Sequence, residues 1–384
     1  MVVRTTRSHH PPQGDLMRST GRPRIAEWFT LSATAGLLLL SACNPDSQAP
    51  ADPALAAGDV EAGKGGCAGW NKDCSEGRNG RIAWTQYVDY TGTAIYSARA
   101  DGSDLRRLTN PVADAWQDNH PDWSPDGSAL IFERDYAGDL GIAQIFRIEP
   151  DGSGLTQLGA CTGDCLGNAF PSWSPDGKNI AFIRWIGPVR EDGNATSGGV
   201  WIMNANGTDA RQVTQLQLPT TTEDSHPRWS PDGRKLVFMR LTTLGLPANR
   251  QAIFVANTDG SDQRRITPWD LDANAPYWSP DGSLILVSSH NDARLPGLSE
   301  LFTVRPDGSD LTRVRIRGLE HLPGIDRFAE NGKFSPDGRS IVFNHQTEAD
   351  FCCVVYRMKA DGSEVLRLSD GIQAAFAPVW GTHR

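Results

Sequence analysis

The stretch His120-Pro-Asp-Trp-Ser-Pro-Asp-Gly127 decides the fold, because close copies of it recur along the chain. The copies are Phe170-Pro-Ser-Trp-Ser-Pro-Asp-Gly177, His226-Pro-Arg-Trp-Ser-Pro-Asp-Gly233, Ala275-Pro-Tyr-Trp-Ser-Pro-Asp-Gly282 and the weaker Gly332-Lys-Phe-Ser-Pro-Asp-Gly338. Successive copies place their turn aspartate 50, 56, 49 and 56 residues apart. A period of about 50 residues indicates a repeated supersecondary unit.

A second motif, Asp-Gly-Ser or a close variant, lies between these copies. It recurs at positions 101, 151, 206, 259, 307 and 361, with Asn in place of Asp at 206. Alternating strands flank it, such as Ile145-Phe-Arg-Ile148, and a short apolar run such as Leu130-Ile-Phe132 follows the first motif. Four short strands in each unit of about 50 residues predict the blade of a β-propeller.

The two motifs have the composition of hairpin turns. In Ser-Pro-Asp-Gly, Pro presets φ at the first corner of a type I turn, and Asp suits the second corner. Gly then suits the left-handed position of a three-residue hairpin. We expect the Trp of each copy, such as Trp123, to pack between neighbouring blades rather than to serve as a ligand platform.

The ends of the repeat region complement each other. Asn79-Gly-Arg-Ile-Ala-Trp84 matches only the second half of the first motif, and the missing half stands at Pro378-Val-Trp-Gly381. We therefore expect the last segment to supply the innermost strand of the first blade, which leaves no free sheet edge. The predicted fold is all-β, a six-bladed β-propeller with four-stranded antiparallel blades over residues 79–384, closed by the C-terminal strand.

These units resemble the TolB-type propeller repeat, a WD-like repeat with Trp-Ser-Pro-Asp-Gly and Asp-Gly-Ser landmarks. The resemblance covers residues 79–381 and does not extend to the N-terminal α/β domain of TolB. TolB is a periplasmic partner of the Tol–Pal envelope system. The resemblance therefore implies a TolB-like propeller that binds a partner at the cell envelope.

Composition excludes two classes of protein. Asp outnumbers Glu 34 to 12, and twelve Asp-Gly dipeptides occur, which is a composition of turns rather than of helix surfaces. The formal net charge is −9, and no cluster of Lys and Arg is present in the sequence. An all-helical fold and nucleic-acid binding are both excluded, because the latter needs a basic face.

The N-terminal region has the features of an export signal. Residues 28–40 form an apolar run of 13 residues, which is too short to span a bilayer but suits a secretory signal. The run ends in Leu40-Ser41-Ala42-Cys43, which resembles the bacterial lipobox, with Cys43 as the lipidated residue. The alternative is an ordinary cleavage site with a chance cysteine.

We therefore divide the N-terminal region into two segments. Residues 1–42 are predicted to be a lipoprotein signal peptide, with Met17 as an alternative start. Residues 43–78 are predicted to be the lipidated cysteine, a flexible tether and a short cysteine-containing lead-in. The expected location is the bacterial cell envelope, exported and lipid-anchored, either periplasmic or on the outer surface.

Six further cysteines fit an exported chain, since disulfides form in oxidising compartments. They are Cys67, Cys74, Cys161, Cys165, Cys352 and Cys353. Six cysteines allow 15 pairings. The local pairs Cys161–Cys165 and Cys67–Cys74 are the first hypotheses, and a long-range pairing of Cys352 or Cys353 stays open. No metal and no cofactor are predicted.

Candidate binding residues were sought on the face opposite the Asp-Gly hairpins. Its loops differ in length and composition, as at residues 186–199, 245–250, 291–299 and 317–330, and variable loops on a rigid frame commonly carry function. The polar residues expected to reach this face are His120, His226, Arg134, Arg184, Arg240 and His345. The three arginines are candidates for a cationic patch, with solvation or pairing with nearby Asp as the alternative.

The predicted function is that of a non-catalytic scaffold that binds an envelope protein or a small anionic ligand, as a monomeric propeller without nucleic acid. Neither Gly-x-Ser-x-Gly nor His-Glu-x-x-His occurs in the sequence, so a serine or zinc hydrolase is not expected. The alternative is a polysaccharide (oligouronide) lyase or hydrolase at the channel mouth. Such an enzyme would draw its catalytic groups from His120, His226, His290, His345 and nearby Asp.

Overall fold

The fold is seen in a computed structural model that describes residues 79–88, 92–110, 116–136, 143–187, 197–214, 222–242, 250–292, 295–317, 329–345, 353–369 and 373–382. These residues form strands β1 to β24 and one short 3-10 helix, η2 (Trp269–Leu271). The prediction of an all-β protein is confirmed. The predicted signal peptide, tether and lead-in at residues 1–78, with Cys43, Cys67 and Cys74, lie outside the described residues.

Four sheets contain four antiparallel strands each. The strands of the first two are β8 (Cys165–Trp173), β9 (Asn179–Ile186), β10 (Ser197–Asn204), β11 (Arg211–Gln212), β12 (Thr222–Trp229), β13 (Lys235–Thr242), β14 (Arg250–Asn257) and β15 (Arg264–Arg265). The strands of the other two are β16 (Ala273–Trp278), β17 (Ile285–Asp292), β18 (Leu295–Val304), β19 (Thr312–Arg313), β20 (Ala329–Phe334), β21 (Ser340–His345), β22 (Val354–Lys359) and β23 (Leu366–Arg367).

The remaining sheet has eight strands, in two antiparallel sets of four. Its strands are β1 (Asn79–Val88), β2 (Gly92–Ala98), β3 (Arg106–Arg107), β4 (Trp116–Trp123), β5 (Leu130–Tyr136), β6 (Ala143–Ile148), β7 (Thr156–Leu158) and β24 (Ala375–Thr382). The set β24-β1-β2-β3 and the set β4-β5-β6-β7 meet at one parallel pair, Thr93 with Gln117. We call every set of four strands a unit.

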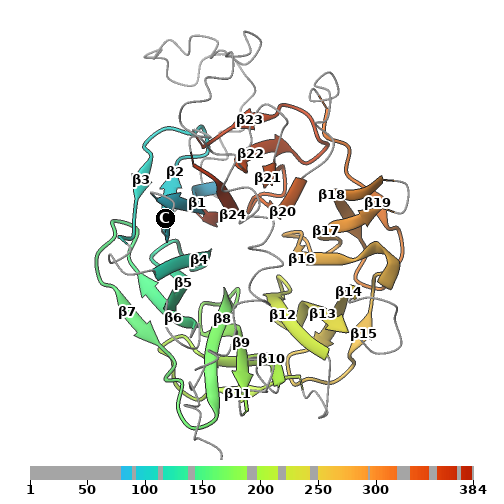
Figure 1. The fold of residues 1–384 in the computed structure, drawn as a ribbon. Coiled ribbons are helices and arrows are strands. Elements are labelled where there is room, and N and C mark those ends of the chain that lie inside the picture. Colours follow the sequence, from blue (N-terminus) through green and yellow to red (C-terminus); the bar gives the residue numbers. More distant parts are fainter. Residues whose placement is uncertain are drawn as a thin grey trace, which may run out of the picture.

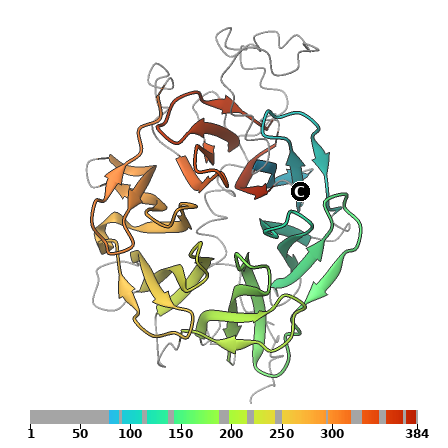
Figure 2. The ribbon, with the colours of Figure 1, turned by 180° about the vertical axis from the view of Figure 1, so that it is seen from behind.

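The units are arranged around a common centre, as Figures 1 and 2 show from opposite sides. Strands β4, β8, β12, β16, β20 and β24 lie nearest the centre, and the two- or three-residue strands lie at the periphery (Figure 1). At the ends of the repeat region, β24 pairs antiparallel with β1, for example Trp380 with Ile82. This is the pairing that the split motif at the two ends predicts.

The repeated turns adopt the conformation that their composition predicts. In the first copy, the Gly127 N–H donates to the Ser124 carbonyl at 2.8 Å, and Asp126 Oδ1 accepts from the Ser128 N–H at 3.0 Å. Gly127 has a φ of 66°, in the left-handed region that favours glycine. The carboxylate therefore fixes the turn internally, and each hairpin ends in a rigid corner.

Apolar contacts join each unit to the next one. Trp123 of β4 packs in one cluster with Ala83 of β1 and Val379 of β24, and Trp278 of β16 packs with Val237 and Met239 of β13. Another cluster contains Ile82 and Trp380 together with Val342 and Val355 of the β20–β23 unit. The prediction that the motif tryptophans pack between neighbouring units is confirmed.

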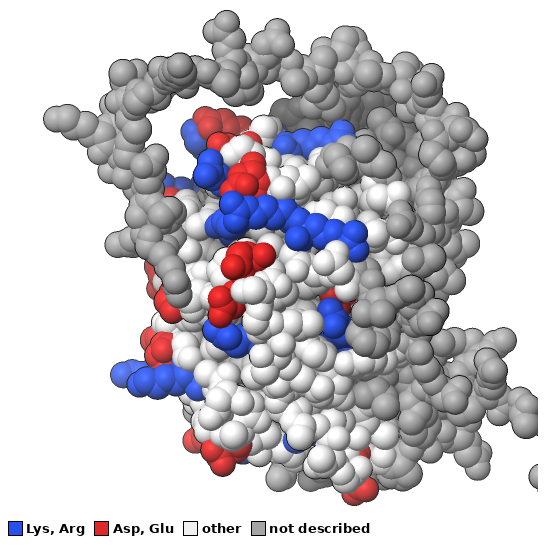
Figure 3. Space-filling view, turned by 90° about the vertical axis from the view of Figure 1, so that its left-hand side faces the viewer, with Lys and Arg blue, Asp and Glu red and all other residues white. Residues whose placement is uncertain are grey.

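The outer side of the molecule carries charges of both signs. Figure 3 shows basic and acidic side chains lying next to one another on the side where β3 and β7 are found. Asp104 pairs there with Arg81 at 2.7 Å and with Arg106 at 2.9 Å. This side offers mixed charge rather than a surface of one sign. Within the described ranges, no helix has the length and apolar character needed to cross a membrane.

Candidate functional site: the central cavity

Each innermost strand contains a bulge at the same place. The residues with positive φ there are His120, Phe170, His226, Ala275, Asn331 and Ala377, with φ between 45° and 53°. Pairing with the next strand slips across each of these positions, as between Asn119 and Asp122 of β4. A bulge places an extra residue in the strand and redirects its side chain, so the three aromatic rings of this series can meet.

The bulges bring His120 and His226 together around Phe170. Ring centroids of His120 and Phe170 lie 4.5 Å apart, those of Phe170 and His226 4.1 Å apart, and those of the two histidines 5.6 Å apart. Because β4 begins at Trp116 and β12 at Thr222, each histidine lies in the middle of its strand and not at the strand start on the loop face.

Hydrogen bonds fix these two imidazoles. His120 Nδ1 lies 2.6 Å from Glu133 Oε1, and Glu133 Oε2 accepts from the backbone N–H of Phe170 in the next unit at 2.6 Å. His226 Nδ1 lies 2.9 Å from Ser225 Oγ. Burial lowers the pKa of His120 to about 3 and raises the pKa of Glu133 to about 7. The imidazole of His120 is therefore neutral at pH 7.

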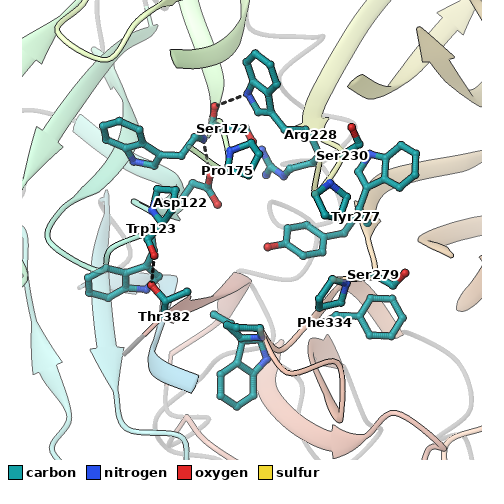
Figure 4. A pocket seen from close by; sticks show the side chains of 18 of the residues that line it. Asp122, Trp123, Ser172, Pro175, Arg228, Ser230, Tyr277, Ser279, Phe334 and Thr382 are labelled. Atoms are coloured by element: carbon teal, nitrogen blue, oxygen red, sulfur yellow. Dashed lines mark hydrogen bonds between the residues drawn. The ribbon is translucent and has the colours of Figure 1, made fainter. Parts of the chain in front are cut away.

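Two residues beyond four of these bulges, a second series of side chains lines a central cavity of about 210 Å³. The cavity walls come from the innermost strands and the Trp-Ser-Pro turns that follow them, with Asp122, Ser172, Arg228 and Tyr277 among the lining residues. Figure 4 shows Asp122, Arg228 and Tyr277 turned toward the same space. Lys333 occupies the corresponding position of β20, with its ammonium 5.8 Å from the centre of the Tyr277 ring.

Burial dominates the electrostatics of this series. It raises the pKa of Asp122, although Arg228 and Lys333 act in the opposite direction. Burial, followed by the charge of Arg228, holds the pKa of Lys333 well below its ordinary value. Burial, followed by the charge of Asp122, raises the pKa of the Tyr277 hydroxyl. The cavity is thus a desolvated place in which an added charge interacts strongly with its neighbours.

This second series was not among the binding residues predicted from the sequence. Its members stand between the repeated Pro and Trp of the first motif, as Asp122, Ser172, Arg228 and Tyr277 do. The signal was available, because this position varies in charge while both of its neighbours repeat. It lies on the hairpin side of the innermost strands, whereas we had looked for function on the opposite face.

The three arginines expected to form a cationic patch are each held within their own unit. Arg134 makes a two-pronged ion pair with Asp118, at 2.6 and 2.8 Å, and Arg240 does the same with Asp224. Arg184 donates to Asn168 Oδ1 at 2.9 Å. Two of the three charges are already neutralised, and this geometry gives no support to a shared patch.

The same three guanidiniums also stack on aromatic rings of their units. Their carbons lie 5.0 Å from the Phe146 ring centre for Arg134, 4.8 Å from Trp201 for Arg184 and 4.6 Å from Phe254 for Arg240. His345 takes the corresponding place in β21, buried against Phe343 and Tyr356. These four residues are therefore parts of the blade interiors.

Of the six candidate disulfide cysteines, three are described. Cys161 and Cys165 form a disulfide, as predicted. Cys353 forms no disulfide with another described residue, and burial raises its pKa to about 12. The loops on the opposite face lie largely outside the described residues, as does Cys352. In the described part of the chain, no three His, Cys, Asp or Glu side chains come together as a set that could hold a metal ion.

The arrangement of units and the inward-facing polar series define the chain as a β-propeller with a central cavity. The family model of the TolB beta propeller domain matches residues 171–382. The chain therefore belongs to the TolB β-propeller domain family.

A solved structure is similar in fold to this chain, and two curated relatives are similar to parts of its sequence. The crystal structure of TolB from Acinetobacter baumannii superposes with a TM-score of 0.59 at 17% identity, covering 79% of this chain and 66% of that one. The uncharacterized peptidase YuxL of Bacillus subtilis is 26% identical over 187 residues, which are 42% of this chain and 27% of YuxL. A probable dipeptidyl-peptidase 5 of Arthroderma benhamiae is 27% identical over 143 residues, 35% of this chain and 19% of the relative. The chain thus matches at most about a quarter of the length of these two peptidases.

Proposed function

We propose that the protein is an exported, lipid-anchored, non-catalytic scaffold whose central cavity binds a segment of a protein partner at the bacterial cell envelope. One observation carries the binding part of this proposal: Arg228 lines the cavity, Lys333 lies buried beside the Tyr277 ring that also lines it, and neither cation forms an ion pair with a carboxylate among the described residues. Burying an unpaired charge lowers the stability of the folded protein. We therefore infer that these two cations serve to bind a group from outside the chain.

A closed ring of six blades is the frame of this proposal. It is supported by the pairing of β24 with β1 and by the apolar cluster that joins Ile82 and Trp380 to Val342 and Val355. Asn79 also exchanges hydrogen bonds with Asp337 at 2.9 and 3.3 Å, across 258 positions of the chain. Export and lipidation rest on residues 28–40 and on Cys43, and Cys43→Ser would release the protein from the membrane fraction.

Site-specific cross-linking tests the scaffold function. A photoreactive side chain is placed at Pro175, an exposed residue on the rim of the cavity, and the matched control carries it at Leu155, which is exposed on an outer turn. Irradiation of intact cells is expected to give a discrete protein adduct from position 175 and none from position 155. An absence of adducts from position 175, or the same adducts from both positions, contradicts the proposal.

An enzyme is the competing function, because two relatives are named peptidases. Its groups would come from His120 and His226 of the innermost strands and from Glu133 of β5, which contacts His120. Purified protein is incubated with peptides and with uronate oligomers, with and without divalent metal. Turnover that disappears in His226→Ala would replace the scaffold proposal by catalysis.

A further inference from the structure

We infer that the central cavity contains a built carboxylate site, in which Arg228 and Lys333 bind one singly charged carboxylate of the bound segment. This inference rests on the proposed function, because it specifies the chemical group that the cavity recognises. It concerns two side chains from different units: Arg228 of β12 lines the cavity, and Lys333 of β20 lies beside the Tyr277 ring that also lines it.

Arg228 supplies donors that its own surroundings do not use. Its side chain is buried, with 5% exposure, and Nη1 donates to the backbone carbonyls of Pro171 at 3.2 Å and Pro227 at 3.1 Å. A guanidinium has five N–H donors. Neither Nε nor Nη2 has a hydrogen-bond acceptor among the described residues, although Arg228 lines the cavity. A carboxylate can accept from a guanidinium in the two-pronged geometry that Arg134 and Asp118 already show in this protein.

Lys333 provides a second cation with even fewer contacts. Its side chain is 6% exposed, and its only described contact of polar character is the one with the Tyr277 ring, 5.8 Å from the ammonium. No described residue accepts a hydrogen bond from this ammonium or pairs with it. Burial costs this ammonium its hydration, which the charge of Asp122 offsets only in part, and a carboxylate oxygen would add a direct interaction.

The local charge favours a single negative charge on the ligand. Asp122 is the acid of this series, and its carboxylate accepts from the Trp173 N–H at 2.8 Å. When all three groups are ionised, Arg228, Lys333 and Asp122 together carry one positive charge, which one carboxylate balances and a phosphate dianion exceeds. The neighbouring His120 and His226 are neutral, and Glu133 is engaged by His120 and the Phe170 N–H.

The size of the cavity limits what surrounds that carboxylate. A volume of about 210 Å³ is smaller than the roughly 300–1,000 Å³ of a typical small-molecule pocket. It suits one side chain or one chain end, with the Trp-Ser-Pro turns as its walls. The carboxylate therefore comes either from the C-terminus of a peptide or from an Asp or Glu side chain, and the experiment separates these two sources.

Four peptide probes and inorganic phosphate test the site by nuclear magnetic resonance titration of the tryptophan indole signals. The probes are Gly-Gly-Gly with a free C-terminus, its C-terminal amide, acetyl-Gly-Asp-Gly-amide and acetyl-Gly-Asn-Gly-amide. At least one of the two carboxylate probes is expected to bind at least tenfold more tightly than its amide counterpart. The one that binds identifies the source of the carboxylate.

Variants assign the binding to the two cations. Arg228→Met and, independently, Lys333→Met are expected to weaken carboxylate binding at least tenfold, while Lys359→Met, which removes an exposed ammonium, leaves it unchanged. Circular dichroism confirms that each variant is folded. The inference is overturned if the wild-type protein binds no carboxylate probe, or if it binds acid and amide probes equally. It is also overturned if phosphate binds more tightly, or if binding is unchanged in both Arg228→Met and Lys333→Met.

The two proposals fail in different ways. If cross-links from position 175 persist in the folded Arg228→Met and Lys333→Met variants, the scaffold function stands and the carboxylate site is wrong. If the carboxylate probes bind but position 175 captures no partner, the site stands and the scaffold function is wrong.

Discussion

This propeller contains two kinds of buried arginine, which differ in the groups that pair with their charge. Arg134 is 4% exposed and locked to Asp118, which is fully buried, by two charge-assisted hydrogen bonds. Arg228 is equally buried, but among the described residues its acceptors are two backbone carbonyls. Arg134 has its counter-charge within its own blade, whereas Arg228 and Lys333 have no paired carboxylate among the described residues. The difference separates charges that serve the fold from charges that serve a ligand.

The largest expected effect is on the complete pair. Asp118→Asn removes the carboxylate and leaves the Arg134 guanidinium buried without its counter-charge. Breaking a buried pair in this way costs about 3–5 kcal/mol. Urea denaturation is expected to show this loss in the free energy of unfolding, whereas the exposed control Asp270→Asn stays within about 0.5 kcal/mol of wild type. A loss below about 1 kcal/mol for Asp118→Asn would contradict the distinction drawn between the Arg134–Asp118 pair and Arg228.

The next effect concerns Glu133 of β5, whose carboxyl contacts the imidazole of His120. Its pKa of about 7 lies above the ordinary value of 4.5, so the folded protein holds this proton more tightly than the unfolded chain does. The stabilisation is fully present below about pH 4.5 and is lost as the pH rises through 7. Glu133→Gln keeps an acceptor for the Phe170 N–H and does not titrate.

Unfolding measurements at pH 5 and pH 8 check this linkage. The stability of the wild type relative to Glu133→Gln is expected to fall by about 1–3 kcal/mol between these pH values. Both proteins contain His120, so its own titration contributes to both curves. Parallel stability curves for the two proteins would show that Glu133 does not titrate in this range.

The smallest effect is expected for Arg228 itself. Arg228→Met removes a buried cation and two hydrogen bonds to carbonyls that water in the cavity can replace. The free energy of unfolding is therefore expected to change by no more than about 1 kcal/mol. Thermal and urea denaturation measure it. A loss comparable to that of Asp118→Asn would place Arg228 among the structural arginines.

The repeat motifs made the blades predictable, because their information is local. Ser124, Asp126 and Gly127 form their turn with one another, so the sequence of a single copy is sufficient to predict the hairpin. The partner of Arg134 was less accessible. Asp118 lies sixteen positions earlier, and the bulge at His120 sets the register that brings the two together.

The residues of the central cavity were harder to predict from the sequence than the hairpins or the Arg134–Asp118 pair. Arg228 and Lys333 are 105 positions apart, and both act on the charge of Asp122 because the units are arranged around one centre (Figure 1). Strand and turn patterns describe each unit separately and carry no distance between them. The signal in the sequence was the position between the repeated Pro and Trp. Its charge differs from copy to copy, whereas the Pro and the Trp on either side repeat.

The most direct test compares Lys333→Met with Arg134→Met in urea unfolding at pH 7. If Arg228 and Lys333 are kept for a ligand, Lys333→Met is at least as stable as wild type, because it removes a buried amino group whose pKa burial holds well below its ordinary value despite the charge of Asp122. Its advantage shrinks as the pH rises toward about 10.4, where the lysine of the unfolded chain also loses its proton. Arg134→Met, which orphans Asp118, loses about 3–5 kcal/mol. A similar loss in Lys333→Met would contradict the account, since Lys333 would then be part of the fold.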